Sequence, residues 1–329
     1  GMVAQIFKTT GPLDYDQDQA VFVERPELKE IFREIRRPYV ESYVALLGSR
    51  QTGKTTLLYR VYRDLKRAGE PTAFVDLSAS RLENISQSYA HAALKIWEEL
   101  TDELASPGKL RAVAGAVDGP IRFREFALEL ARQCSGMRIV ILLDEVGSFM
   151  SNMGFFETLR NISSSSGHES EQAFKKYLFV FSGSVDLHDL TSGQNSPLAN
   201  VCKLIHLQDF DLSGTRFLVN NLRQVASVED SVAEYIHDLA RGHPYLTQRI
   251  CALIAQGQPA GPIAIQEVDQ AIDQMQEGDE NLRYVTMQLE RHPQARDLLR
   301  RMVMEGLKVP FSTIDPRMAR LFVIGAVRR

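Results

Sequence analysis

Cysteine is scarce in this sequence, and its spacing excludes several kinds of site. Cys134, Cys202 and Cys251 are the only three cysteines in 329 residues, and no two have the short spacing of a metal or redox motif. An odd number of distant thiols also argues against a disulfide framework, which favours a reducing compartment. The cysteine content therefore predicts a cytoplasmic protein.

Long apolar runs are missing as well. Stretches such as IVILL at 139–143 are far shorter than the roughly 20 residues that a membrane-spanning helix needs. The N-terminal stretch also lacks the charged-then-apolar pattern of a signal peptide. We expect no association with a membrane.

A strong excess of basic charge is also missing. The net charge is −4, which argues against a protein that coats nucleic acid indiscriminately. The distribution is uneven, however, because residues 291–329 hold nine Arg/Lys against three Asp/Glu. This basic end fits nucleic acid or an acidic partner, and it equally fits a solvated helical surface.

The pattern along the first two thirds of the chain predicts an α/β domain. Apolar, β-rich runs at 43–49, 72–78, 137–145, 176–184 and 203–211 alternate with helical patterns. Strands that alternate with helices form a parallel sheet. The helices are expected from Pro26, at 54–69, 84–104, 121–134 and 153–162, with loops at 106–120 and in the serine-rich stretch 163–170.

The strand signal ends near residue 212. Helical patterns follow at 213–225, 229–241, 244–256, 263–276 and 293–305. We predict an α/β core at 1–212, a helical lid at 213–290, and the start of a winged-helix-like domain at 291–329. The last part is expected to be cut short, because no β-wing follows it.

A phosphate-binding loop is the most specific motif. The stretch GSRQTGKT fits G-x-x-x-x-G-K-[ST] and lies between a predicted strand and a predicted helix. Glycines let the backbone N–H groups point at phosphate oxygens, the lysine places a cation on them, and the hydroxyl ligates Mg²⁺. The predicted nucleotide-binding residues are Gly48, Ser49, Arg50, Gln51, Thr52, Gly53, Lys54, Thr55 and Thr56, and Lys54 is also predicted to be catalytic.

Two acids follow the apolar run IVILL. Asp144 and Glu145 stand at the carboxyl end of the predicted third strand, where open α/β sheets bind their ligands. Adjacent strand residues project to opposite sides, so one acid faces the metal and the other the γ-phosphate. We predict that Asp144 and Thr55 bind Mg²⁺ and that Glu145 polarises the attacking water. Alternatively, Asp144 caps the next helix and Glu145 is solvated.

With these motifs placed, the chain resembles the AAA-like ATPases of the STAND (signal-transducing) and archaeal-ATPase-like group of P-loop NTPases. The resemblance rests on GPLDYDQDQAVFVERPEL, LLGSRQTGKTTLL, IVILLDE, LFVFSGS and GHPYLTQ, which span most of the chain. It implies that the bound nucleotide is ATP or ADP with Mg²⁺. A guanine-reading Asn-Lys-x-Asp motif is absent from the sequence.

The resemblance also implies roles for positions outside the phosphate loop. Val23 and Arg25 would lie beside the adenine ring, although an amphipathic helix start with a solvated arginine is the alternative. In the G-x-P turn, Gly242 would permit the turn and Pro244 would pack on the adenine, while we expect His243 on the surface.

The resemblance also suggests a γ-phosphate sensor and an arginine finger. Ser182 or Ser184 would sense the γ-phosphate, and the sequence does not fix which. Arg160 is a candidate arginine finger for a neighbouring subunit, but a solvated arginine fits the pattern better.

Three functions remain open at this level. The leading hypothesis is an ATP-binding, slowly hydrolysing molecular switch that acts on a protein effector or on further domains, with self-association possible. The second is a DNA-binding ATPase akin to origin-recognition or transposition-helper proteins, which the basic end favours and the acidic remainder opposes. The third, a small-molecule kinase, requires an arginine-rich lid that the helical region does not suggest.

Overall fold

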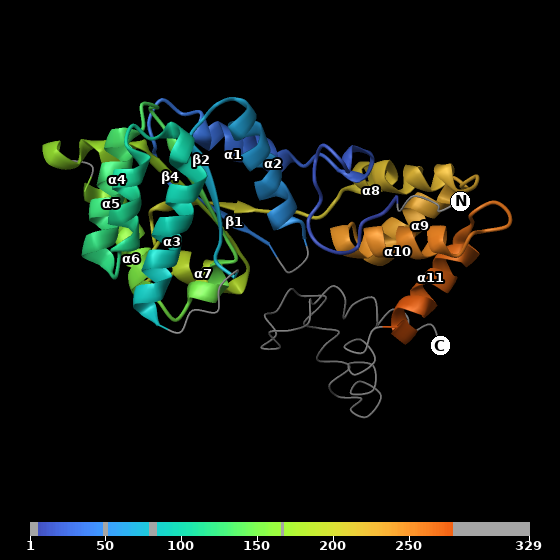
Figure 1. Cartoon of the computed structure of the whole chain (residues 1–329). Helices are drawn as coiled ribbons and strands as arrows, with labels where there is room; N and C mark the ends of the chain where they lie inside the picture. The colour runs from blue at the N-terminus through green and yellow to red at the C-terminus, as the bar shows by residue number, and fades with distance from the viewer. Residues whose placement is uncertain (1–5, 49–51, 79–83, 166–167, 279–329) are drawn as a thin grey trace. The chain divides into compact units, whose positions relative to one another are not determined.

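The structure is a computed structural model of the chain, and it describes residues 6–48, 52–78, 84–165 and 168–278. The chain divides into two compact units (Figure 1). We call residues 26–49 and 54–207 the sheet unit, and residues 1–25, 50–53 and 208–329 the helical unit. Each of the two units has its own hydrophobic core.

The sheet unit contains the predicted five-stranded parallel sheet. Its strands lie in the order β2-β3-β4-β1-β5, and all pair in parallel. Their bounds are β1 Tyr43–Leu47, β2 Thr72–Asp76, β3 Ile139–Asp144, β4 Tyr177–Gly183 and β5 Cys202–His206. The fold class predicted from the alternation of strands and helices is therefore confirmed.

The burial of each strand explains its composition. Every residue of β1, β3 and β4 is buried, because helices cover the sheet on both faces, and a continuous apolar run fits that position. β5 lies at the edge of the sheet, where Lys203 and Leu204 are exposed. A lysine on an edge strand discourages pairing with another chain.

The helices of the sheet unit follow the predicted pattern except at 107–115 and 185–191, where no helix was predicted. Helix α2 buries Leu57, Leu58, Val61 and Leu65 on one side and is followed by Gly69 in a left-handed conformation (φ +73°), the usual way to end a helix. The helices are α1 Pro26–Ile35, α2 Lys54–Arg67, α3 Ile85–Leu100, α4 Pro107–Gly115, α5 Pro120–Gln133, α6 Met153–Ser165 and α7 Val185–Thr191.

The prediction of a loop at 106–120 is wrong. Residues Pro107–Gly115 form helix α4, with a proline in the first turn, where the missing N–H costs nothing. Leu110 and Ala114, four residues apart, are both buried. The packing of this short apolar face outweighs the glycines that suggested a loop.

The serine-rich stretch is also not simply a surface loop. Helix α6 continues through Ser165, which is buried and accepts a hydrogen bond from Arg124 (Nη1 to Oγ, 3.1 Å). Residues 169–176 form a 3₁₀ helix. Tertiary packing therefore overrides the low helix propensity of serine here.

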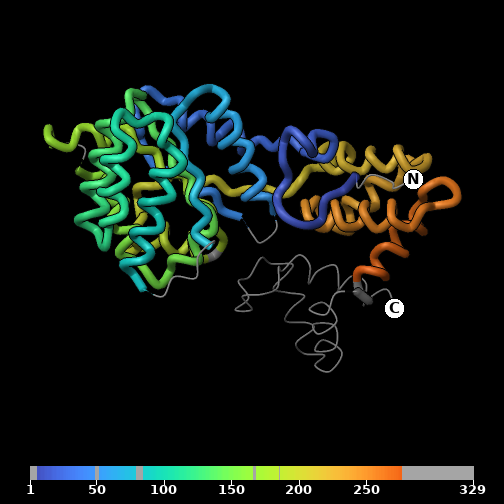
Figure 2. Tube along the Cα trace, in the orientation of Figure 1, coloured from blue at the N-terminus to red at the C-terminus, as the bar shows by residue number. Residues whose placement is uncertain are grey.

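The helical unit combines the N-terminal segment with the helices after residue 207. Its helices are α8 Leu212–Val219, α9 Ser231–Ala240, α10 Pro244–Gln256 and α11 Ile265–Gly278. Phe7, Val21 and Val23 belong to the same core as Leu218 and Ile250. Figure 2 shows the N-terminal segment (blue) running along these helices (yellow and orange).

The predicted domain boundaries at residues 212 and 290 stay predictions, and the winged-helix-like region at 291–329 lies outside the described residues. Within the part of the chain that the structure describes, no helix combines the length and the apolar character needed to cross a membrane.

Candidate functional site

The two ends of the predicted phosphate loop meet in the sheet unit. β1 leads into Gly48, and α2 begins at Lys54. Lys54 Nζ donates a hydrogen bond to the Gly48 carbonyl oxygen (2.8 Å). Ser49, Arg50 and Gln51 lie outside the described residues, so their predicted phosphate contacts stay predictions.

The turn before α2 has the conformation that the motif requires. Gly53 adopts a left-handed backbone (φ +92°), which only glycine reaches at little cost. Thr52 is fully buried, and Thr55 and Thr56 are half-buried in the first turn of α2. The second glycine of the motif is therefore a conformational necessity.

The threonine of the loop and the acid of β3 are in direct contact. Thr55 Oγ1 donates a hydrogen bond to Asp144 Oδ2 (2.7 Å). Asp144 is the last residue of β3 and is buried, so it does not simply cap the next helix. The structure thus brings together the two residues that the sequence assigned to Mg²⁺.

The electrostatics of Asp144 favour a bound cation. Burial raises the pKa of its carboxyl above the ordinary value, and the Thr55 and Ser182 hydroxyls and the Glu145 backbone N–H lower that pKa in part. Asp76 raises the pKa further. A cation beside Asp144 would offset the cost of burying its charge.

The donor set fits Mg²⁺. A hydroxyl and a carboxylate are hard oxygen donors, and Mg²⁺ in nucleotide sites keeps several waters and takes only one or two protein ligands. The described residues contain no group of three or more His, Cys, Asp or Glu side chains that could hold a metal. Thr55 and Asp144 would hold the ion.

Glu145 differs from its neighbour in exposure and conformation. Its side chain is exposed, whereas that of Asp144 is buried, so the two carboxyl groups face different surroundings. The role of Glu145 at the γ-phosphate stays a prediction, and its exposure also fits the solvated alternative. Glu145 adopts a left-handed backbone (φ 57°, ψ 52°), which costs a residue with a side chain about 1 kcal/mol or more. Strain of this kind concentrates at functional sites.

The two candidate sensor serines lie in different places. Ser182 is buried near the end of β4, one position beyond Phe181, which pairs with Leu143 of β3, and its hydroxyl lowers the pKa of the Asp144 carboxyl. Ser184 follows the strand, is half-buried and precedes α7. Ser182 is therefore next to the acid of β3, and the assignment of the sensor stays a prediction.

Arg160 is not the solvated arginine that the sequence favoured. It is half-buried in α6, and its Nη1 donates to the carbonyl oxygens of Pro197 and Ala199. These bonds attach α6 to the segment before β5. The arginine-finger role stays a prediction.

The predicted adenine-proximal residues all lie in the helical unit. Val23 is buried in its core, and Arg25 is buried with its guanidinium against backbone carbonyls. Pro244 is buried at the start of α10. Gly242 has a left-handed backbone (φ +76°), and its carbonyl oxygen accepts a hydrogen bond from the Phe210 N–H (2.9 Å).

The expectation of a surface His243 is wrong. Its side chain is fully buried, and Nδ1 accepts a hydrogen bond from the Leu246 N–H (3.2 Å) at the N-terminus of α10. This bond satisfies one of the N–H groups that a helix leaves without a partner in its first turn. The ring therefore has a capping role that a lone histidine in the sequence does not reveal.

The sequence analysis did not assign Asp76 or Phe210 to the site. Asp76 ends β2 directly opposite Asp144 in the parallel register, so its charge affects that carboxyl. The apolar run TAFV followed by an acid resembles IVILL followed by Asp144, and this pattern could have identified Asp76 from the sequence. Phe210 lies under the Arg25 guanidinium (5.2 Å to the ring centroid), and nothing in the sequence pairs these two residues.

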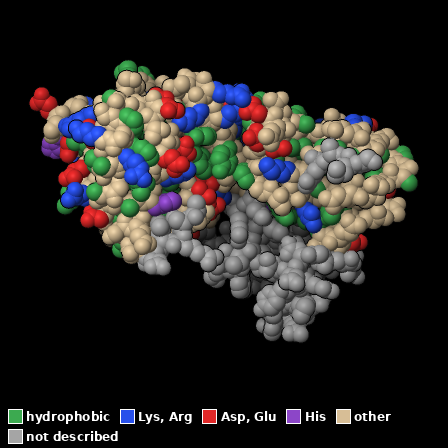
Figure 3. Space-filling view, viewed as in Figure 1, with side chains coloured by type: hydrophobic (Ala, Val, Ile, Leu, Met, Phe, Trp, Pro, Cys, Tyr) green, Lys and Arg blue, Asp and Glu red, His purple; other side chains and the backbone are tan. Residues whose placement is uncertain are grey.

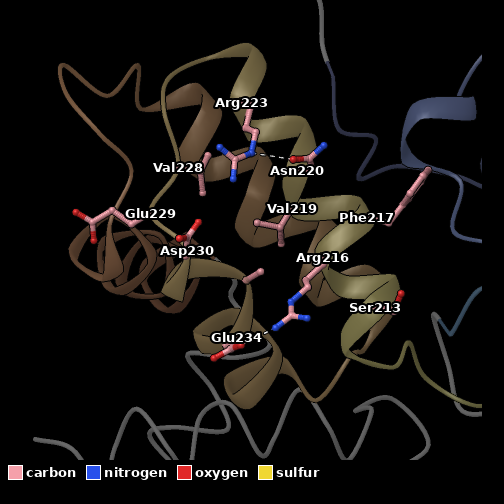
Figure 4. Close-up of a pocket in the computed structure, with 11 residues that line it drawn as sticks. Ser213, Arg216, Phe217, Val219, Asn220, Arg223, Val228, Glu229, Asp230 and Glu234 are labelled. Carbon is pink, nitrogen blue, oxygen red and sulfur yellow. Dashed lines mark hydrogen bonds and ion pairs between the residues drawn. The ribbon is translucent and has the colours of Figure 1, made fainter.

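A cavity of about 540 Å³ also lies in the helical unit (Figure 4). Arg216 and Glu234 form an ion pair there (2.5 Å), and Arg223 Nε donates to Asn220 Oδ1 (2.8 Å). Its lining includes none of the predicted nucleotide-binding residues. The lining residues are Ser213, Arg216, Phe217, Val219, Asn220, Arg223, Val228, Glu229, Asp230, Ala233 and Glu234.

Replacing Gly242 with alanine is expected to destabilise the helical unit. A Cβ at this position would lie 2.0 Å from the Phe210 carbonyl oxygen, and the left-handed backbone adds strain. Together these effects cost about 2–6 kcal/mol, which chemical denaturation would measure. Gly261→Ala is the control, because its added Cβ meets no atom within 4 Å. Equal stability of the two variants would contradict the tight turn.

Replacing Asp144 with asparagine is expected to stabilise the nucleotide-free protein. At neutral pH the change removes a buried charge, and the amide oxygen can still accept from Thr55. Because the folded-state pKa is raised, the wild-type carboxyl contributes less stability as the pH rises. The gain in melting temperature should therefore shrink as the pH falls toward the ordinary value of 3.8.

The same variant should lose the additional stabilisation that ATP with Mg²⁺ gives the wild type. Asp118→Asn, at an exposed position, is the matched control and should change neither quantity. A lower melting temperature of Asp144→Asn at neutral pH would count against this account of the carboxyl.

A family model described as an AAA-like domain matches residues 11–328. The chain belongs to the AAA-like domain family. No curated protein matches the chain. With the loop at the end of β1 and the acid at the end of β3, this AAA-like domain has the α/β fold of P-loop ATPases.

Solved structures resemble the AAA-like domain over most of its length. Cdc6p from Pyrobaculum aerophilum is 14% identical, with 98% of this chain and 82% of that chain covered and a TM-score of 0.51. Orc1 from Aeropyrum pernix, in complex with DNA, is 13% identical (98% and 79% covered, TM-score 0.48). The Holliday junction branch migration motor RuvB from Thermotoga maritima is 15% identical (88% and 79% covered, TM-score 0.47). At these identities, similarity shows the fold alone.

Proposed function

We propose that this AAA-like domain is an ATP-driven molecular switch of the STAND type, which binds ATP with Mg²⁺ and hydrolyses it slowly. The observation that carries the proposal is the hydrogen bond between Thr55 in the phosphate loop and Asp144 at the end of β3. The Lys54 ammonium, bonded to the Gly48 carbonyl, supports it, because a lysine at this point of the loop is placed to bind phosphate.

Some residues of the site bind the nucleotide and the metal ion, and others take part in hydrolysis. Lys54 and the backbone N–H groups of the loop bind the phosphates, and Thr55 and Asp144 hold Mg²⁺, which supplies charge neutralisation at the β- and γ-phosphates. The exposed carboxylate of Glu145 orients and polarises the attacking water. Ser182 or Ser184 contacts the γ-phosphate.

The proposal also includes the adenine-proximal residues that the resemblance implies. Val23 and Arg25 lie beside the base and Pro244 packs on it, at the turn that Gly242 makes possible. A nucleotide changes a conformational equilibrium only if it contacts the two states differently. The proposed output is therefore a change in the helical unit that a protein effector, further domains or a second copy of the chain detects.

Phosphate release tests the proposal. The purified protein should release phosphate slowly from ATP, and chelation of Mg²⁺ should stop the reaction. GTP should be a poor substrate, since the sequence holds no guanine-reading motif. Fast turnover, or turnover that does not need a divalent cation, would contradict the proposed switch.

A DNA-binding ATPase is the second candidate, and the observation in its favour is the basic stretch at 291–329. Against it, residues 208–278 hold four Arg and ten Asp/Glu, a net charge of −6. Figure 3 shows acidic and basic side chains interspersed on one face of the described sheet unit. Retention on duplex DNA that falls steeply with salt would favour this candidate, because phosphate contacts release counterions.

A further inference from the structure

Arg25 is a buried arginine whose partners are backbone carbonyls of the helical unit. Its side chain is 9% exposed, Nη1 donates to the Thr52 carbonyl and Nη2 donates to the Gln208 carbonyl. The guanidinium also lies over the Phe210 ring, 5.2 Å from its centroid. Thr52 precedes α2 in the phosphate loop, and Gln208 opens the segment that leads to α8, so one side chain joins two segments that are 156 positions apart in the sequence.

The fit around the Arg25 guanidinium is tight. A Cβ added to Gly53 would lie 2.7 Å from Arg25 Nη1, so the loop backbone approaches the guanidinium as closely as a glycine allows. A planar guanidinium donates in fixed directions, unlike a lysine ammonium. Movement of the Thr52 carbonyl would therefore break or redirect a hydrogen bond of a buried charge, which is costly.

The contacts continue from Phe210 to the G-x-P turn. The Phe210 N–H donates to the Gly242 carbonyl oxygen (2.9 Å), and Gly242 has no room for a side chain against the Phe210 carbonyl. The next residue, His243, caps α10 through Leu246. The phosphate-loop turn, Arg25, the 208–210 segment and the start of α10 thus form one continuous set of contacts within the helical unit.

We propose that Arg25 is a positioning residue that couples the phosphate loop to the G-x-P turn, so that nucleotide bound at the loop stabilises the start of α10. This role rests on the proposed function, because it assumes that the loop binds nucleotide. It deepens that function by naming the side chain that transmits the nucleotide state. Coupling of this kind is reciprocal and typically changes an equilibrium about 5- to 150-fold.

Hydrogen exchange of backbone amides tests the coupling. With a slowly hydrolysed ATP analogue and Mg²⁺ at saturation, wild-type protein should show slower exchange in the Gly53–Leu58 segment. It should also show exchange about 5-fold slower or more at Phe210, Leu246 and Thr247. These three amides donate to Gly242, to the His243 ring and to the His243 carbonyl.

Arg25→Lys and Arg25→Ala are the test variants, and Arg223→Ala, an exposed arginine of the same unit, is the matched control. Because Arg25 is also placed beside the base, nucleotide is raised for each variant until the protection of Gly53–Leu58 no longer increases. At that concentration, the change at Phe210, Leu246 and Thr247 in Arg25→Lys should fall below about 2-fold. Arg25→Ala should give the same result, and Arg223→Ala should behave as wild type. The lysine variant keeps the charge, so it serves if the alanine variant does not fold.

The possible outcomes distinguish a failure of the coupling role from a failure of the proposed function. Full protection of the three amides in Arg25→Lys would overturn the coupling role, and so would wild-type protection confined to Gly53–Leu58. Absence of nucleotide-dependent protection anywhere in the wild type would instead overturn the proposed function.

Discussion

Replacing Lys54 with alanine is expected to weaken ATP binding by about 30-fold or more, enough to remove it from a micromolar titration. The ammonium is the cation that the motif places on the phosphates, and truncating one partner of a charged, desolvated contact costs about 2–5 kcal/mol. In the ligand-free protein, the change removes the hydrogen bond from Nζ to the Gly48 carbonyl. Calorimetric titration of ATP with Mg²⁺ measures the effect.

Lys66→Ala is the matched control for this variant. Lys66 lies in the same helix, and its Nζ donates to the Glu99 carbonyl (2.9 Å) rather than to the loop. Its ATP affinity should remain that of the wild type. If Lys54→Ala also bound ATP with unchanged affinity, the phosphates could not lie at this loop.

Replacing Glu145 with glutamine is expected to leave ATP bound but to lower turnover by about 10²- to 10⁴-fold. The amide has the size of the carboxylate and loses its charge and basicity, so it cannot accept a proton from water. Because Asp144 and Thr55 remain in place, Mg²⁺ binding should persist. Phosphate release at saturating ATP measures turnover, and titration measures affinity.

Glu157→Gln is the control, since Glu157 is an exposed residue of α6. It should hydrolyse ATP at the wild-type rate. Wild-type turnover in Glu145→Gln would mean that another residue is the catalytic carboxylate. Loss of ATP binding would mean that Glu145 is needed to bind ATP rather than to activate water.

The strands of the sheet could be predicted from the sequence because their apolar runs are continuous. IVILL and YLFVF have no alternation, as strands covered on both faces require, and each run ends in the polar residue that reaches the site. The same logic placed Asp144 at a strand end next to the helix that starts at Lys54. Motif spacing and strand position therefore predicted that Thr55 and Asp144 share one site, and the two residues are in contact.

Features that depend on three-dimensional packing were not predictable in the same way. The short apolar face of α4 gives a weak periodic signal, and the burial of His243 depends on a cap that forms only when Gly242 turns the chain. The sequence placed Arg25 beside the adenine ring, with a solvated helix-start arginine as the alternative, whereas its hydrogen-bond partners in the structure lie 27 and 183 residues away. Neither local propensity nor periodicity reports such distant contacts.

Direct titration of ATP with Mg²⁺ into the wild-type protein tests the central claim, once any copurified nucleotide has been identified by chromatography and removed. The account predicts saturable binding of one adenine nucleotide per chain, weakened when Mg²⁺ is chelated, and no comparable binding of GTP. An absence of binding for both nucleotides would mean that GSRQTGKTT is only a strand-to-helix turn, and the proposed switch would be contradicted.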